Sequence, residues 1–332
     1  MNDHPEGWKP QLGLLPAIPG RPTLQLRSLA AEPVALPVPP PEIHNIERVP
    51  DRDMLGNDKW GDCVFAAIEN NRRIAAATLG ATITRLTAAQ VVANYKSHTG
   101  ATTPPGPGAV IQKALKWAHD HGWGGSKLLC YATLPRTELA IREAVNEFQS
   151  CLFGVVIKAA QEYPAKVWAD VGGKTVGGHG VAGGTETVGY DFAKTWGYMV
   201  EMTPNFMHVQ CNEVSVLVWD FQWASLTYDR QVSLVADYQA LTGKTWTGPA
   251  PIAPPPVPPT PPTPTPPAPT PPPARKTFTV TTQKTIHDVA LAVHGNPRLL
   301  LRWNQGRYGL SDAANSSLYQ AVQPGWVLFI TA

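Results

Sequence analysis

The chain has 332 residues, with 27 Lys and Arg against 25 Asp and Glu, a formal net charge of +2 and 43% hydrophobic residues. These values exclude a wholly disordered chain, because enough apolar residues are present to bury a core. The nearly balanced charge gives no reason to expect a nucleic-acid partner.

Targeting signals and bound metals are not expected either. Met1–Glu6 has neither the basic nor the apolar region of a secretion signal, and no apolar run is long enough to span a bilayer. The 4 cysteines are widely spaced and include no CxxC pair. The sequence therefore predicts no signal peptide, membrane span, disulfide framework, metal site or cofactor.

The 35 prolines divide the chain, because most of them fall in residues 1–50 or in Pro249–Pro273. We expect an extended N-terminal arm at 1–50 that lies along the surface of a globular domain at 51–247. A proline-rich linker at 248–275, semi-rigid and in the polyproline II conformation, should lead to a small module at 276–332.

Within the globular domain, apolar residues recur first at helical spacing and later in strand-like segments. Helices are expected from about Cys63 and over Ala88–Lys96, Ala109–His119 and Glu138–Gln149, with Thr87 and Thr137 as N-caps. Strands are expected at Leu152–Lys158, His179–Gly184, Val188–Trp196 and Val214–Asp220, with a helix from Pro204 through Cys211. Helices followed by strands predict an α+β fold.

One cysteine lies where a glycine-containing loop enters an apolar helix. Unpaired N–H groups at a helix start stabilise a thiolate, so Cys63 needs only a nearby imidazole to act as a nucleophile. His179 supplies a candidate imidazole on a strand that glycines flank. Taken singly, each residue also fits a structural role in a core, and Cys130, Cys151 and Cys211 are expected to be core residues.

The combination of motifs resembles the papain-like cysteine peptidases, and more closely the papain-like proteins encoded by actinobacteriophages and their hosts. The matching segments are Leu55–Cys63, Gly177–His179, Thr195–Gly197 and Met202–Pro204. The resemblance implies a two-lobe domain, a helical lobe followed by a β lobe. It also implies that Cys63 is the nucleophile and His179 the general base.

Two further roles follow from the resemblance. Asn57 lies where the family carries a glutamine amide that stabilises the tetrahedral oxyanion, and asparagine can donate the same hydrogen bond over a shorter reach. The asparagine that orients the histidine is replaced by Lys194, which cannot accept its proton. Asp191 and Thr195 are the alternatives on one strand face, and Asp191 is chemically the better orienting group.

The C-terminal segments Phe278–Val280, Thr285–Gly295, Asn296–Asn304 and Val322–Ile330 predict a β-α-α-β module. This module resembles a LysM domain, which implies binding of N-acetylglucosamine-containing glycans such as peptidoglycan. The implied glycan-binding residues are Thr282, Gln283, Lys284, Thr285 and Asn304. Residues 275–332 carry an excess of basic residues that would assist attraction to anionic wall polymers, while docking to a protein is the alternative.

These resemblances imply a phage-type, cell-wall-directed cysteine peptidase that LysM tethers to peptidoglycan. It would be made in the bacterial cytoplasm and be virion-associated or released to the cell wall. The alternative is a catalytically weak or inactive structural protein of the virion tail or baseplate, with other virion proteins as partners. An NlpC-type or CHAP amidase is a third hypothesis, which the long separation between Cys63 and His179 disfavours.

Overall fold

The structure is a computed structural model that describes residues 11–17, 39–51, 53–162, 165–187, 189–253, 277–282, 284–285, 289, 321–324 and 327–329. The chain divides into two compact units, residues 1–254 and 255–332. In the described ranges, no helix has both the length and the apolar character needed to cross a membrane.

Helices and strands of the first unit confirm the predicted α+β class, with helices first and strands later. The helices are α1 (Cys63–Leu79), α2 (Ala88–Thr99), α3 (Ile111–His121), α4 (Glu138–Phe148), α5 (Pro204–Gln210) and α6 (Tyr228–Thr242), with short 3₁₀ turns η1 (Ile46–Arg48), η2 (Ala159–Gln161) and η3 (Asp220–Ser225). The strands are β1 (Ile43–His44), β2 (Leu128–Thr133), β3 (Cys151–Lys158), β4 (Val167–Trp168), β5 (Thr175–Thr187), β6 (Tyr190–Thr195), β7 (Tyr198–Met202) and β8 (Cys211–Trp219).

Local signals account for the helix boundaries. The Thr87 hydroxyl accepts a hydrogen bond from the backbone N–H of Gln90, and the Gln90 side chain accepts one from the backbone N–H of Thr87. This capping box starts α2. Thr137 and Thr203 cap α4 and α5 in the same way through their hydroxyls. Gly80 ends α1 with φ 67°, a left-handed conformation that glycine adopts without strain.

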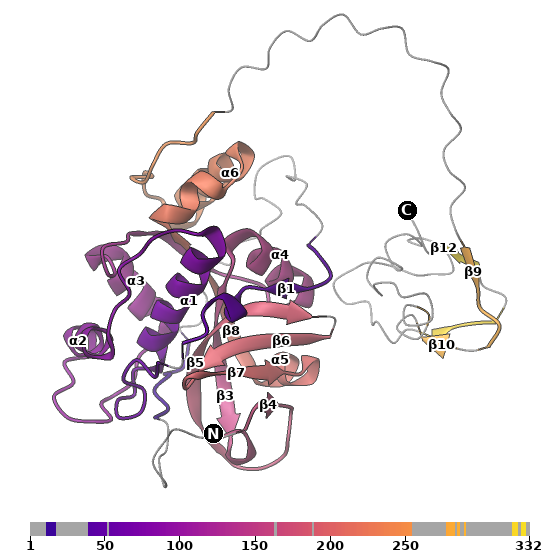
Figure 1. Cartoon of the computed structure of the whole chain (residues 1–332), viewed down its shortest axis with the longest axis horizontal. Helices are drawn as coiled ribbons and strands as arrows, with labels where there is room; N and C mark the ends of the chain where they lie inside the picture. Colours follow the sequence, from indigo (N-terminus) through magenta and orange to yellow (C-terminus); the bar gives the residue numbers. More distant parts are fainter. Residues whose placement is uncertain are drawn as a thin grey trace, which may run out of the picture. The chain divides into compact units, whose positions relative to one another are not determined.

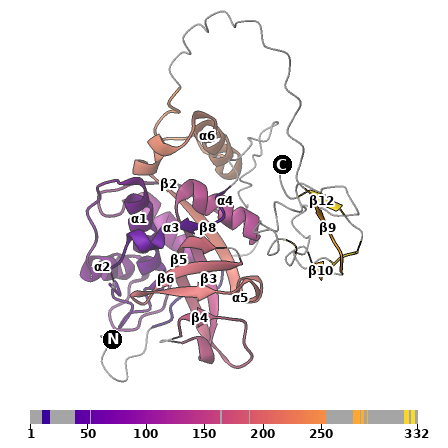
Figure 2. The same cartoon turned by 45° about the vertical axis from the view of Figure 1, so that its right-hand side comes forward.

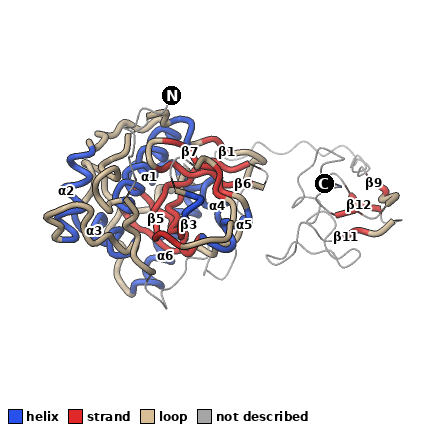
Figure 3. Tube along the Cα trace, turned by 90° about the horizontal axis from the view of Figure 1, so that it is seen from below, coloured by secondary structure: helices blue, strands red, loops and turns tan. Residues whose placement is uncertain are grey.

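One mixed sheet organises the domain, with strand order β2-β8-β3-β5-β6-β7-β4, and β1 paired to β5. Neighbouring strands are antiparallel except for β4 and β7. α1 lies between the sheet and the helices α2 and α3, as Figures 1 and 3 both show. The resulting helical part and sheet part have separate apolar cores, one around α1 to α3 and one around β3, β5 and β8.

The N-terminal arm is part of this domain rather than a surface appendage. Ile43 and His44 pair with the end of β5, and Asn45 donates its amide to the Gln149 carbonyl. Residues 11–15 lie between the two parts of the domain, where they bridge to Gly178 and Ala109. This position corrects the expectation that the whole arm lies on the domain surface.

The predicted linker also begins later than its composition indicated. The Trp223 indole donates to the Ala250 carbonyl, and the Ile252 N–H donates to the Gln231 side chain. Figure 2 shows this part of the chain leaving the domain beside α6. Residues up to 252 therefore pack on the first unit.

In the second unit the described residues form two antiparallel strand pairs. β9 (Thr277–Thr279) pairs with β12 (Val327–Phe329), and β10 (Lys284–Thr285) pairs with β11 (Ala321–Val322). The pairing of the first and last strands agrees with the end strands of the predicted β-α-α-β module. The two predicted helices, apart from the buried Val289, and the residues Gln283 and Asn304 lie outside the described residues.

Candidate active site

Cys63 is the first residue of α1 and is 1% exposed. The backbone N–H of Gly180, on β5, donates to its Sγ over 3.4 Å. Burial raises the pKa of the Cys63 thiol to about 11, while hydrogen bonds from the backbone of Gly180 and Gly13 act in the opposite direction. In this closed state the sulfur is therefore a neutral thiol.

His179 lies next to that contact, one residue before Gly180 on β5. Its Nε2 lies 2.6 Å from the Thr195 hydroxyl, and its ring stacks on Trp196 with centroids 4.4 Å apart and an angle of 27°. Its Nδ1 is buried and has no hydrogen-bond partner among the described residues. Burial lowers the pKa of His179 to about 3, so the imidazole is neutral.

Thr195 lies within hydrogen-bond distance of His179, whereas Asp191, chemically the better orienting candidate, makes no such contact among the described residues. Asp191 is opposite Glu186 in the β5–β6 register, several residues further along β5 than His179. A bulge between Gly183 and Thr185 shifts this register, so the alternation along β6 alone could not show which residue reaches the ring. Thr195 directly precedes Trp196, and its hydroxyl can accept the imidazole proton.

Lys194 points away from the histidine, as the alternation of side chains along a strand requires. Its ammonium is 3% exposed and donates to the carbonyls of Val49 and Asp51 and to the Asp51 carboxylate at 2.5 to 3.0 Å. Lys194 thus fastens the N-terminal arm to β6.

Asn57 is 2% exposed, and its side-chain amide is fully hydrogen-bonded. The Trp196 indole donates to its Oδ1 over 2.9 Å. Nδ2 donates to the carbonyls of Gln11 at 2.9 Å and Trp60 at 3.0 Å. Trp196 therefore positions both the candidate base and the candidate oxyanion donor.

An extended segment that sequence reasoning missed covers these residues. Gln11–Leu15, here called the strap, hydrogen-bonds through its main chain to Ala109 of the helical part and to Gly178 of the sheet part. The space between these two parts that the strap fills is called the groove. The Gln11 N–H donates to the Asn57 carbonyl at 3.1 Å, and the Leu14 N–H to the Gly178 carbonyl at 3.1 Å. The only sequence signal for it is the alternation of Leu12, Gly13 and Leu14.

Asp62 precedes Cys63 and is fully buried. Burial raises the pKa of its carboxyl well above the usual value, which favours the neutral acid. A neutral Asp62 places no full negative charge beside the thiol. Cys130, Cys151 and Cys211 are buried free thiols, as expected of core residues.

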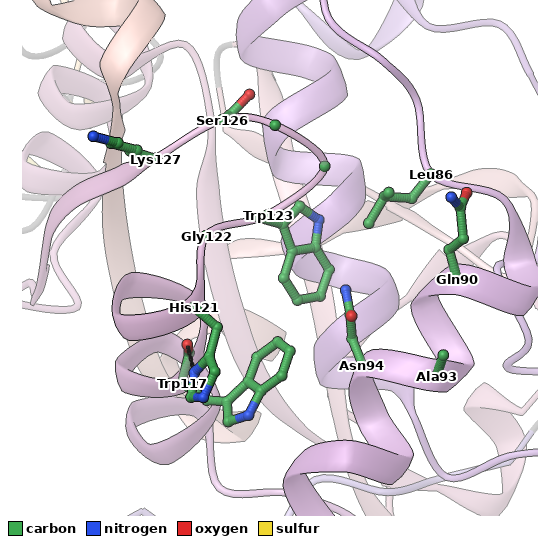
Figure 4. Close-up of a pocket in the computed structure, with 12 residues that line it drawn as sticks. Leu86, Gln90, Ala93, Asn94, Trp117, His121, Gly122, Trp123, Ser126 and Lys127 are labelled. Carbon is green, nitrogen blue, oxygen red and sulfur yellow. Dashed lines mark hydrogen bonds between the residues drawn. The ribbon is translucent and has the colours of Figure 1, made fainter.

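A separate hollow of about 500 Å³ opens between α2, α3 and the loop that follows α3. Figure 4 shows Gln90 and Asn94 on one side and Trp117 with His121 on the other, the last two stacked at 4.6 Å. Its lining includes neither a cysteine nor a carboxylate. In the described residues no group of three or more His, Cys, Asp or Glu side chains is placed to hold a metal ion.

Comparison with known proteins found similar folds but no sequence relatives. No protein-family model and no curated protein matches the chain. Among solved structures, it is similar to xylellain, a cysteine protease from Xylella fastidiosa, at 12% identity and a TM-score of 0.49 over 63% of this chain and 96% of that one. It is also similar to proCathepsin B S9 from Trypanosoma congolense, at 11% identity and a TM-score of 0.45 over 63% and 86% of the two chains.

A third similar structure is procathepsin L 3 of Tenebrio molitor larval midgut, at 15% identity and a TM-score of 0.44 over 60% of this chain and 76% of that one. All three identities are below a quarter and all three TM-scores are below 0.5.

Proposed function

We propose that the first unit is a cysteine peptidase whose thiol the strap covers. The observation that carries the proposal is one connected arrangement around Trp196. Its ring stacks on His179, its indole N–H donates to Asn57, and the hydroxyl of the neighbouring Thr195 lies within hydrogen-bond distance of His179. Gly180, the residue after His179, donates its N–H to the Cys63 sulfur. A merely structural cysteine and histidine would not need an amide aimed at a carbonyl in the same groove.

Each group has a defined step in peptide hydrolysis. His179 Nδ1 takes the thiol proton while Cys63 Sγ bonds to the peptide carbonyl carbon, and Asn57 Nδ2 donates to the resulting oxyanion. His179 then protonates the departing amine as the C–N bond breaks, which leaves a thioester. Water, deprotonated by His179, attacks the thioester, the C–S bond breaks and the proton returns to sulfur.

Asn57 already makes the contact that this role requires. Its Nδ2 donates to the Gln11 carbonyl of the strap, a peptide carbonyl held in the groove. Asparagine has a shorter reach than glutamine, and we propose that the turn at Leu55 and Gly56 compensates by bringing the Asn57 backbone closer to the groove. The φ values of these two residues are 57° and 100°. Both residues adopt left-handed conformations, and a Cβ at Gly56 would lie 2.2 Å from the Val92 side chain.

For the second unit we propose the tethering role that its LysM resemblance implies. The paired end strands and the buried Val280, Val289 and Leu328 are compatible with such a module. A wall-binding module on a proline-rich linker would raise the effective concentration of the peptidase at an insoluble substrate. Under this proposal the protein is a phage-type, cell-wall-directed peptidase, virion-associated or released to the wall.

A structural virion protein is the second candidate, and the covered thiol is the observation that favours it. With the strap in place Cys63 is 1% exposed and its pKa is about 11, so this state cannot attack a substrate. The two candidates differ in whether the site reacts once the strap is displaced.

Alkylation of the full-length Gly13→Ala variant with iodoacetamide, followed by mass spectrometry, tests the proposal. We expect Cys63 to react much faster than Cys130, Cys151 and Cys211, and a second change, His179→Ala, to abolish this difference. Hydrolysis of a peptide mixture from peptidoglycan stems should accompany the reactivity. Slow and equal labelling of all four thiols would favour the structural role.

Tethering is tested by retention of the full chain on purified peptidoglycan at low salt. Thr285→Ala combined with Asn304→Ala should release the protein. Thr277→Ala, at an exposed position on β9, is the matched control and should not. Equal retention of both variants would contradict glycan binding at the proposed residues.

A further inference from the structure

The strap shows which peptide backbone the groove over Cys63 accepts. Ala109 donates its N–H to the Gly13 carbonyl at 2.7 Å and accepts from the Leu15 N–H at 2.9 Å, while Gly178 accepts from Leu14 on the opposite side. All of these contacts use main-chain atoms, so any extended peptide can form them. Selection among peptides must therefore come from the side chains that the groove admits.

At the centre of the strap there is no room for a side chain. A Cβ at Gly13 would lie 1.9 Å from the Gly61 carbonyl oxygen and 2.4 Å from its carbon. This carbonyl cannot easily withdraw, because the Gly61 N–H donates to the Pro105 carbonyl over 2.6 Å and the next carbonyl, that of Asp62, accepts from the backbone of Phe65 in the first turn of α1. The groove beside the thiol thus admits a glycine and resists an alanine.

The other side of the groove is equally fixed. Tyr95, on α2, donates its hydroxyl to the Pro105 carbonyl and accepts from the Gly108 N–H, both at 3.2 Å. A Cβ at Gly108 would lie 2.3 Å from the Gly13 carbonyl oxygen. Tyr95 therefore holds the loop at 105–108 close to the strap. As a result, neither Gly108 nor Gly13 has room for a methyl group.

The positions on either side of the glycine are apolar. Leu12 packs against the core of the sheet part, and its side chain lies 3.0 Å from where a Cβ at Gly177 would be. Leu14 packs against the core of the helical part and lies 3.1 Å from a Cβ position at Gly154. Glycines on β5 and β3 make space for these two side chains.

We infer that the groove selects extended peptides with a glycine opposite the thiol and leucine-sized apolar residues on both sides of it. This inference rests on the proposed function, because it names the substrate class of that site. The strap presents the backbone N–H of Gly13, and not a carbonyl carbon, to the Cys63 sulfur. Tyr95 is the positioning residue for this selectivity.

The first experiment opens the groove in the full-length protein. Gly13→Ala should displace the strap and raise the rate of Cys63 alkylation by about tenfold or more. Gly172→Ala is the matched control, because a Cβ there meets nothing within 4 Å, and it should leave the rate unchanged. An unchanged rate in Gly13→Ala would overturn the inference.

The second experiment measures selectivity with two peptides on the opened protein by calorimetry, which does not require a reactive thiol. The peptide Gln-Leu-Gly-Leu-Leu should bind about tenfold or more tightly than the same peptide with alanine for glycine. Adding Tyr95→Phe should reduce the ratio between the dissociation constants of the alanine and glycine peptides. Equal binding of the two peptides overturns the inference. Preferred binding of the glycine peptide, together with slow and equal labelling of the four thiols, overturns the proposed function alone.

Discussion

The Thr195 hydroxyl lies 2.6 Å from Nε2 of His179 and leaves Nδ1 of that ring free of hydrogen bonds among the described residues. When Nε2 carries the ring proton and donates it to this hydroxyl, the lone pair of Nδ1 is the base that the proposed mechanism uses. A neutral hydroxyl orients the ring without the negative charge that an aspartate would supply.

Replacing Thr195 tests this assignment. Thr195→Val keeps the shape but removes the acceptor, and it should lower the hydrolysis rate of the opened protein by about 10- to 100-fold. Thr195→Ser should restore most of the rate. Asp191→Asn should have no comparable effect, and a larger loss in that variant would return the orienting role to Asp191.

Removing the amide of Asn57 should act on the chemical step. Asn57→Ala is expected to lower kcat by about 100-fold with little change in KM, because the oxyanion forms only after the thiol attacks. Steady-state kinetics on the opened protein measure both constants. A rise in KM at constant kcat would show that Asn57 binds substrate and does not stabilise the oxyanion.

Alkylation of Cys63 should depend on pH differently in the closed and opened states. In the native chain the thiol pKa is about 11, so the rate should keep rising through pH 9 and 10. Opening the groove removes the burial that raises this pKa, and the midpoint in Gly13→Ala should move to lower pH. Identical midpoints in the two proteins would show that the strap does not control thiol ionisation.

His179 should also make stability depend on pH. Burial lowers its pKa in the folded chain to about 3, below the ordinary histidine value of about 6.5, so the unfolded chain binds the proton first as the pH falls. This contribution to stability is complete above pH 6.5 and decreases towards pH 3. At pH 4.5 the cost is about 2–3 kcal/mol.

Urea unfolding at pH 7 and pH 4.5 measures this cost when the native chain is compared with His179→Leu. Between pH 7 and pH 4.5 the free energy of unfolding of the variant should fall by about 2–3 kcal/mol less than that of the native chain. Asp191 and Glu186, whose pKa values are raised by burial, act in the opposite direction but contribute equally to both proteins. An unchanged pH dependence in the variant would mean that the imidazole is protonated in the folded state.

Lys194 should matter for stability alone. Lys194→Met leaves the Val49 and Asp51 carbonyls without their buried donor and should lower the free energy of unfolding by about 2–3 kcal/mol. The hydrolysis rate per folded molecule should not change, because the ammonium points away from His179. Lys113→Met, at an exposed position on α3, is the control. It should change neither the free energy of unfolding nor the hydrolysis rate.

Several features of the site follow from the sequence because they depend on local chemistry. The capping threonines and apolar spacing predicted the main helices, and the glycine-rich entry to α1 singled out Cys63. The strands β2 and β7 and the helix α6 were not predicted, because their apolar patterns are short or weak. Motif order also indicated that His179 and the segment around Trp196 act together.

Tertiary structure decided the rest. Whether Asp191 or Thr195 reaches His179 depends on a bulge in the β5–β6 register, which no single strand encodes. That Gln11–Leu15 lies over the thiol depends on hydrogen bonds to residues 46 to more than 160 positions away. The sequence by itself thus determined which groups the site contains, while long-range pairing determined their partners and closed the groove.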